Sequence, residues 1–132
     1  MSGAPLLLEV ENLATHFDTR SGIVKAVDGV SFTLKRGEVM GLVGESGSGK
    51  SITGFSVIGL IDAPGRIAGG HIRYLGEELV GASEARLQKL RGKEIAMIFQ
   101  DPMMTLNPVL RVDTQMVEAI HAHEKVSPKA AL

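Results

Sequence analysis

Residues 44–51 read Gly44-Glu45-Ser46-Gly47-Ser48-Gly49-Lys50-Ser51, which fits the pattern G-x-x-x-x-G-K-[ST]. Loops of this pattern wrap phosphate groups, because glycines let several backbone N–H groups approach the anion closely. The lysine can reach the terminal phosphates, and the serine hydroxyl is a hard oxygen ligand that suits Mg²⁺. The stretch therefore predicts a site for nucleotide phosphates in which Lys50 and Ser51 have these two roles.

The residues on either side of the loop support this interpretation. The loop follows a short apolar run typical of a buried parallel strand, Val39-Met40-Gly41-Leu42-Val43. After the loop, Ile52, Phe55 and Ile58 recur at helical spacing, which predicts an amphipathic helix over residues 50–60. Strand, glycine loop and helix in this order favour a binding site over a flexible Gly/Ser linker, and the unpaired amides at the start of such a helix also attract anions.

Composition narrows the class of protein. The 132 residues are at most one domain's worth of chain, and a hydrophobic content of 44% is ordinary for a globular protein. A net charge of −1 gives no bulk attraction to nucleic acid or to anionic lipid. The chain has no cysteine, so disulfides and thiolate metal sites are excluded. No apolar run is long enough for a signal segment or a membrane span, so we expect no direct membrane insertion.

Strand and turn signals surround the loop. Strands are predicted over residues 6–10, 23–27 and 30–34, with turns at Glu11-Asn12 and Asp28-Gly29, which together give a small antiparallel sheet. Further along, we expect an edge strand at 71–75, a helix between Ser83 and Gly92, and an apolar strand at 94–99. A proline-containing loop at 100–108 and a helix from Val112 to His123 complete the expected elements.

Taken together, these motifs resemble the nucleotide-binding subunits of ABC transporters. The sequence looks most like the ATPase subunits of dipeptide and oligopeptide importers, a group whose relatives also move nickel. Beside residues 44–51, the resemblance rests on three stretches: Leu8-Glu9-Val10-Glu11-Asn12-Leu13, Val24-Lys25-Ala26-Val27-Asp28-Gly29-Val30-Ser31-Phe32 and Met97-Ile98-Phe99-Gln100-Asp101-Pro102-Met103-Met104-Thr105-Leu106-Asn107-Pro108. The Gly-Glu-Ser-Gly-Ser-Gly form of the loop and the Phe-Gln-Asp-Pro stretch are its most specific parts.

The resemblance implies an α/β fold: a RecA-like P-loop NTPase core with an N-terminal antiparallel β subdomain and the start of a helical subdomain. We expect the β subdomain at residues 1–38, the core up to the Q-loop at 39–100, and the helical subdomain from 101 to 132. The family's signature segment, its Walker B strand with the acidic metal ligand and adjacent glutamate, and its switch histidine do not occur here. We therefore expect an incomplete chain that is inactive alone, the ATP-binding half of an intact ATPase.

The resemblance also assigns roles to single residues. Phe17 corresponds to an aromatic ring that stacks on adenine, although a Phe that merely packs the small sheet is the alternative. Gln100 corresponds to the Q-loop glutamine, whose amide can touch the Mg²⁺ shell and the attacking water without adding charge. We expect Lys50 and Gln100 to act in catalysis and Ser51 and Gln100 to contact the metal. Nucleotide contacts are expected for Phe17, Gly44, Glu45, Ser46, Gly47, Ser48, Gly49, Lys50, Ser51 and Ile52.

The implied function is binding and hydrolysis of ATP, with Mg²⁺, to power the uptake of peptides or similar small solutes. The expected partners are transmembrane permease subunits and a second ATPase subunit, identical or different, with no nucleic acid. The expected location is peripheral, at the cytoplasmic face of the inner membrane. Two alternatives remain open: a non-transport ABC ATPase of DNA repair or chromosome organisation, and a small P-loop kinase or GTPase.

Overall fold

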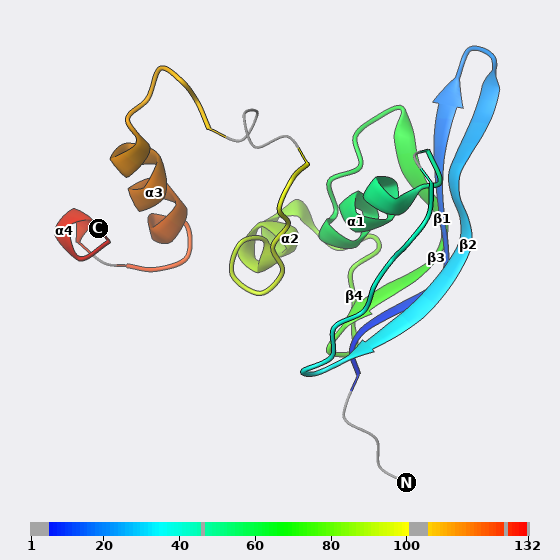
Figure 1. The fold of residues 1–132 in the computed structure, drawn as a ribbon, viewed down its shortest axis with the longest axis horizontal. Helices are drawn as coiled ribbons and strands as arrows, with labels where there is room; N and C mark the ends of the chain where they lie inside the picture. The colour runs from blue at the N-terminus through cyan, green and yellow to red at the C-terminus, as the bar shows by residue number, and fades with distance from the viewer. Residues whose placement is uncertain (1–5, 46, 101–105, 126, 132) are drawn as a thin grey trace, which may run out of the picture. The chain divides into compact units, whose positions relative to one another are not determined.

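The computed structural model of the chain (Figure 1) describes residues 6–45, 47–100, 106–125 and 127–131. The chain divides into two compact units, Met1–Leu87 and Gln88–Leu132, with the boundary inside helix α2 (Glu84–Leu90). The first unit holds a sheet and the helix that follows the glycine loop. The second unit holds helices α3 (Val112–His121) and α4 (Pro128–Ala131).

An antiparallel sheet of four strands forms the frame of the first unit. Its strands are β1 (Leu6–Thr19), β2 (Gly22–Lys35), β3 (Gly65–Tyr74) and β4 (Glu77–Glu78), in the order β2-β1-β3-β4. β1 and β2 are joined by the two residues Arg20 and Ser21, and the hydroxyl of Thr19 donates to the carbonyl of Gly22 at 2.6 Å. The strand expected at the edge, residues 71–75, is instead the end of β3, which lies between β1 and β4.

Two predicted turns are wrong, because each is an irregularity inside a long strand. Asn12 has a φ of 48° within β1, and its backbone N–H donates to the hydroxyl of Ser31 at 2.8 Å. In β2, Gly29 has a φ of 82° and is skipped by the pairing, which passes from Leu13–Val30 to Ala14–Asp28. Asn and Gly favour several types of turn and also G1-type β-bulges, since these place one residue in the left-handed backbone conformation.

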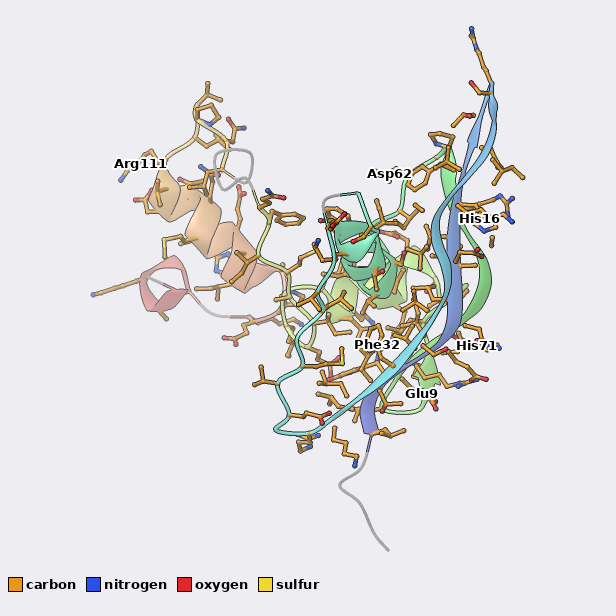
Figure 2. All side chains as sticks on the ribbon, turned by 45° about the vertical axis from the view of Figure 1, so that its right-hand side comes forward. Glu9, His16, Phe32, Asp62, His71 and Arg111 are labelled. Carbon is orange, nitrogen blue, oxygen red and sulfur yellow. The ribbon has the colours of Figure 1, made fainter. Side chains whose placement is uncertain are left out.

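The bulge in β1 directs the apolar side chains of the sheet. Val10 and Leu13 are three residues apart, yet both are buried, because the extra residue between them shifts the alternation by one. They form the core with Val27 of β2 and Ile72 of β3. Helix α1 (Lys50–Ile58) contacts β1 and β2, and its residue Ile58 is buried. Figure 2 shows Phe32 on the side of the sheet that faces this helix, and His71 on the other side.

The outward side of the sheet is charged. Arg73 of β3 donates to the carboxylates of Glu9 at 2.9 Å and Glu11 at 3.0 Å, both on β1. Glu78 of β4 accepts from the backbone N–H of Ile72 at 3.0 Å and lies 2.6 Å from Nδ1 of His71. An antiparallel sheet with one covered face and one solvated face alternates in this way.

The prediction of a strand at residues 39–43 is wrong for this structure. These residues form no strand, and the side chains of Val39 and Val43 are 97% and 93% exposed. The apolar run was the expected signature of a parallel strand buried on both faces. A strand also needs a neighbour whose backbone groups pair with its own, and none of the described residues pairs with this run.

The second unit differs from expectation in a similar way. The predicted strand at 94–99 is absent, apart from an isolated parallel bridge between Arg91 and Ile95, and Ile98 is 98% exposed.

The two helices expected in this part of the sequence are confirmed. The first is α2, where the N–H of Arg86 donates to the hydroxyl of Ser83, and the second is α3, which begins at Val112. Over the residues that the structure describes, no helix is both long enough and apolar enough to cross a membrane.

Candidate functional site

The loop of residues 44–51 has three glycines at positions that a side chain would disturb. Gly47 and Gly49 have φ values of 83° and 102°, which side chains of L-residues rarely allow. A Cβ on Gly44 would lie 2.4 Å from Oγ of Ser48, and a Cβ on Gly49 would lie 2.5 Å from the carbonyl oxygen of Ala26. The backbone N–H of Ser48 donates to the carbonyl of Glu45 at 3.0 Å, which tightens the turn. The loop backbone thus turns tightly and packs closely against its neighbours, as the glycines of the motif predict.

The ammonium group of Lys50 lies within this loop. Its Nζ donates to the carbonyl oxygen of Gly44 and, at 3.0 Å, to that of Glu45. These contacts hold a positive charge beside the backbone of a loop that the sequence assigns to phosphate. An anion placed there would gain a charge-assisted hydrogen bond from the same ammonium group, which is stronger than a neutral one.

Helix α1 begins at Lys50 and follows the loop without a break. Its first turn is fixed at Gly49, whose carbonyl accepts from the backbone N–H of Thr53 at 2.9 Å and from its hydroxyl at 2.8 Å. Gly49 provides no side-chain cap, and no acidic residue lies in the first turn. The positive end of the helix dipole is therefore not neutralised by carboxylates of that turn, which suits an anion. The hydroxyl of Ser51 is exposed in this turn, and Ile52 is half-buried.

Phe17 lies near the end of β1, where it pairs with Val24 on one side and Gly65 on the other. Its ring fills the space above Gly65: a Cβ there would lie 2.6 Å from Cε1 of Phe17 and 2.8 Å from Cγ2 of Ile61. The ring is half-buried, so part of its surface remains accessible. The packing alternative for Phe17 thus has a definite partner, and a role in stacking adenine stays a prediction.

A charged pair lies next to Phe17 in the sheet, where Asp18 follows Phe17 in β1 and Arg66 follows Gly65 in β3. Nε of Arg66 donates to the carboxylate of Asp18 at 3.0 Å and Nη2 donates at 3.4 Å, which makes a two-pronged pair. The hydrogen bond from Arg66 lowers the pKa of Asp18 below its ordinary value, against the opposing effect of burial. Both side chains are about half exposed, so the pair adds little to stability and mainly fixes the local geometry.

Other predicted site residues lie outside this cluster or outside the described residues. Gln100 belongs to the second unit, and its side chain is exposed. Ser46 of the loop and residues 101–105, where the helical subdomain was expected to begin, lie outside the described residues. The structure brings together Gly44, Glu45, Gly47, Ser48, Gly49, Lys50, Ser51 and Ile52 in the loop and the first turn of α1.

Sequence reasoning missed three buried hydroxyl groups behind the loop, those of Thr15, Thr53 and Ser56. Thr53 and Ser56 lie three residues apart, a spacing that places both on one side of α1. Oγ1 of Thr15 lies 2.7 Å from Oγ of Ser56. The only sequence signal was the small polar residues at this helical spacing, which by itself does not distinguish a buried pair from a solvated one.

Comparisons with known proteins place this geometry in a family. The family model described as ABC transporter matches residues 27–131. The chain is 50% identical over 126 residues to the oligopeptide transport ATP-binding protein OppD of Bacillus subtilis (strain 168), which covers 95% of this chain and 35% of that protein. It is 48% identical over 118 residues to the dipeptide transport ATP-binding protein DppD of Escherichia coli (strain K12), covering 89% and 36%. The chain therefore spans little more than a third of the length of these relatives.

Solved structures of ABC cassettes share the fold of this chain. The dimeric structure of MJ0796, a bacterial ABC transporter cassette, superposes with a TM-score of 0.80 at 21% identity, over 94% of this chain and 52% of that one. A nucleotide-free ATP-binding cassette from an ABC transporter superposes with a TM-score of 0.62 at 25% identity, over 96% and 45%. This likeness confirms the expected α/β fold of an ABC cassette, its antiparallel sheet included. The chain belongs to the ABC transporter family.

Proposed function

We propose that this protein binds ATP through residues 44–51 and serves as the ATP-binding subunit of an ABC importer for peptides or similar small solutes. The observation that carries the proposal is the loop itself. Positive φ values at Gly47 and Gly49 and the ammonium group of Lys50 at the loop carbonyls make a cradle fitted to phosphate. Identities of 48–50% to peptide-transport ATP-binding proteins favour this class of importer.

Different residues of the loop would bind different parts of Mg²⁺-ATP. Backbone N–H groups of the loop and of the first turn of α1 would bind phosphate oxygens, and Lys50 would exchange its contacts with the Gly44 and Glu45 carbonyls for contacts with phosphate. The hydroxyl of Ser51, exposed in the first turn, would ligate Mg²⁺ together with Gln100. The metal would supply neutralisation of phosphate charge during hydrolysis.

Phe17 and Gln100 would extend the site beyond the phosphates. The accessible part of the Phe17 ring would stack on adenine, while its packed edge against Gly65 keeps the ring in place. Gln100 would couple the nucleotide site to the membrane partner. Its amide can bind either the metal shell or a water molecule without a change of charge, so its contacts would differ with the bound nucleotide. In this proposal, residues 1–38 are the β subdomain, 39–100 the core, and 101–132 the start of the helical subdomain.

The importer would place the protein at the cytoplasmic face of the inner membrane as a peripheral subunit. Its partners would be transmembrane permease subunits and a second ATPase subunit. Two such subunits would hold two nucleotides between them, and closure of the pair would move the permease. The names of the relatives, which describe transport of oligopeptides and dipeptides, support this part of the proposal.

The direct test is nucleotide binding by a Lys50→Ala variant of the protein in the form that its gene encodes. Loss of a charge-assisted hydrogen bond should weaken Mg²⁺-ATP binding by about tenfold to a hundredfold, measured by calorimetry. Lys89→Ala is the matched control, because Lys89 is an exposed lysine on α2, outside the loop. Equal affinity of wild type and Lys50→Ala would overturn the assignment, as would absence of any binding by the wild type.

A further inference from the structure

Two buried hydroxyl groups connect the helix of the phosphate loop to strand β1. Thr15 is fully buried and Ser56 is 3% exposed, and their hydroxyl oxygens lie 2.7 Å apart. The two residues are 41 positions apart in the sequence. Through this pair, α1 and β1 are joined by a hydrogen bond, which is directional, in addition to the non-directional packing of apolar groups.

The direction of the hydrogen bond follows from the other partner of Ser56. The hydroxyl of Ser56 donates to the carbonyl of Ile52 at 2.7 Å. A serine hydroxyl has a single proton, so Ser56 accepts from Thr15, and Thr15 is the donor. A chain of hydrogen bonds therefore runs from Thr15 through Ser56 to Ile52, the residue that follows Ser51 in the first turn of α1.

The same strand holds the other end of the proposed nucleotide site. Thr15 and Phe17 are two residues apart in β1, so they lie on the same face of the strand. The β1 pairing with β3 is regular here, from Thr15–Ile67 to His16–Arg66 to Phe17–Gly65. One strand thus holds both the aromatic ring and the hydroxyl that fixes α1, while α1 holds Lys50 and Ser51.

We propose that the Thr15–Ser56 hydrogen bond is a positioning contact for the nucleotide, which sets the phosphate loop relative to Phe17. The inference rests on the proposed function. ATP must reach both the loop and the ring, so its affinity depends on how α1 lies against β1. Inorganic tripolyphosphate has the phosphates without the adenosine and needs only the loop. Removing the bond should therefore weaken ATP and leave tripolyphosphate unchanged.

The test measures the binding of Mg²⁺-ATP and of Mg²⁺-tripolyphosphate to the protein as its gene encodes it. Thr15→Val removes the donor with little change of shape, and Ser56→Ala removes the acceptor. Each should raise the Kd for ATP by about three- to tenfold, the usual effect of one internal hydrogen bond. Ser56→Ala also removes the hydrogen bond from Ser56 to the carbonyl of Ile52. The double variant should therefore resemble Ser56→Ala, because that single variant already removes the Thr15–Ser56 contact. Thr15→Ser, which keeps the donor, should restore the affinity for ATP.

Controls separate positioning from loss of fold. Thr33→Val is the same substitution at an exposed site of β2 and should leave both affinities unchanged. Circular dichroism of each variant checks folding, and Ser56→Ala provides a second route if Thr15→Val fails to fold. If the variants bind ATP and tripolyphosphate equally more weakly, the Thr15–Ser56 pair only supports the fold. If their affinity for ATP is unchanged, the pair has no role in nucleotide binding. If the wild type binds neither ligand, the proposed function fails, and this inference fails with it.

Discussion

Gly49 lies directly against the backbone of Ala26, with no room for a side chain between them. A Cβ on Gly49 would stand 2.5 Å from the carbonyl oxygen of Ala26. Ala26 is itself irregular, because the pairing of β1 with β2 passes from Thr15–Val27 to His16–Lys25 and skips it. A bulge in β2 and a glycine in the loop thus meet at the point where α1 begins, so the sheet and the phosphate loop depend on each other for their geometry.

Gly49→Ala should consequently disable the loop. Its φ of 102° strains any side chain, and the Ala26 carbonyl would have to move. We expect a loss of about tenfold or more in ATP affinity and a lower melting temperature, because strain of this kind costs about 1–3 kcal/mol. Gly41→Ala is the control, since a Cβ at that position would meet nothing within 4 Å and its φ is not positive. A Gly49→Ala protein that binds ATP normally would contradict this account.

Phe17→Leu tests whether the ring stacks on adenine or only packs the sheet. Leucine keeps most of the apolar contact with Gly65 but removes the flat face, so affinity for ATP should fall by about threefold to tenfold. Binding of tripolyphosphate should not change. Phe32→Leu, at a half-buried position of β2, is the matched control for the loss of a ring from the sheet. If both variants bind ATP like the wild type, Phe17 is a packing residue.

Gln100→Ala tests coupling instead of binding. The proposed role of Gln100 lies between the metal shell and the membrane partner, so its loss should lower ATP hydrolysis and solute uptake in the assembled importer. Nucleotide affinity should stay within about several-fold of the wild-type value, because Gln100 would touch the Mg²⁺ shell but is not a main phosphate ligand. Gln88→Ala, at an exposed glutamine of α2, is the control. If the Gln100→Ala importer takes up solute at the wild-type rate, Gln100 has no role in coupling.

The sequence predicted local features well where the local residues alone decide them. The loop at Gly44 to Ser51, the helix after it and the helix between Ser83 and Gly92 follow from short-range rules, and the structure confirms both helices. The run at 39–43 was misassigned because strand formation depends on partners that no local pattern specifies. The hydroxyl pair of Thr15 and Ser56 could not be predicted, because it joins residues that only the fold brings together.

Acid should weaken the β3–β4 corner through Glu78. Burial raises the pKa of Glu78, but the N–H groups of Ile72 and Val80 and the ring of His71 together outweigh it, so the pKa lies below the ordinary value of 4.5. A lowered carboxyl pKa stabilises the fold above the unfolded value, and this stabilisation is lost as the pH falls through the folded value.

The melting temperature should therefore fall between about pH 5 and about pH 3, and fall less in Glu78→Gln, which has no carboxylate to titrate there. Glu94→Gln, at an exposed position of the second unit, should follow the wild type. Identical pH profiles of Glu78→Gln and the wild type would show that these contacts do not contribute to stability.

Residues 1–132 expressed alone should not release phosphate steadily from Mg²⁺-ATP. Phosphoryl transfer to water needs a group that orients the water and charges that neutralise the transferred phosphoryl. Of the residues proposed to act in hydrolysis, this sequence contains Lys50, Ser51 and Gln100; the family's Walker B acid with its adjacent glutamate and the switch histidine do not occur in it. The backbone at residues 39–43 should also exchange its amide hydrogens far faster than β1, because Val39 and Val43 are exposed and the run is unpaired in the described structure. A phosphate-release assay and hydrogen exchange test both expectations, and steady turnover by these residues would mean that they hold a complete catalytic site.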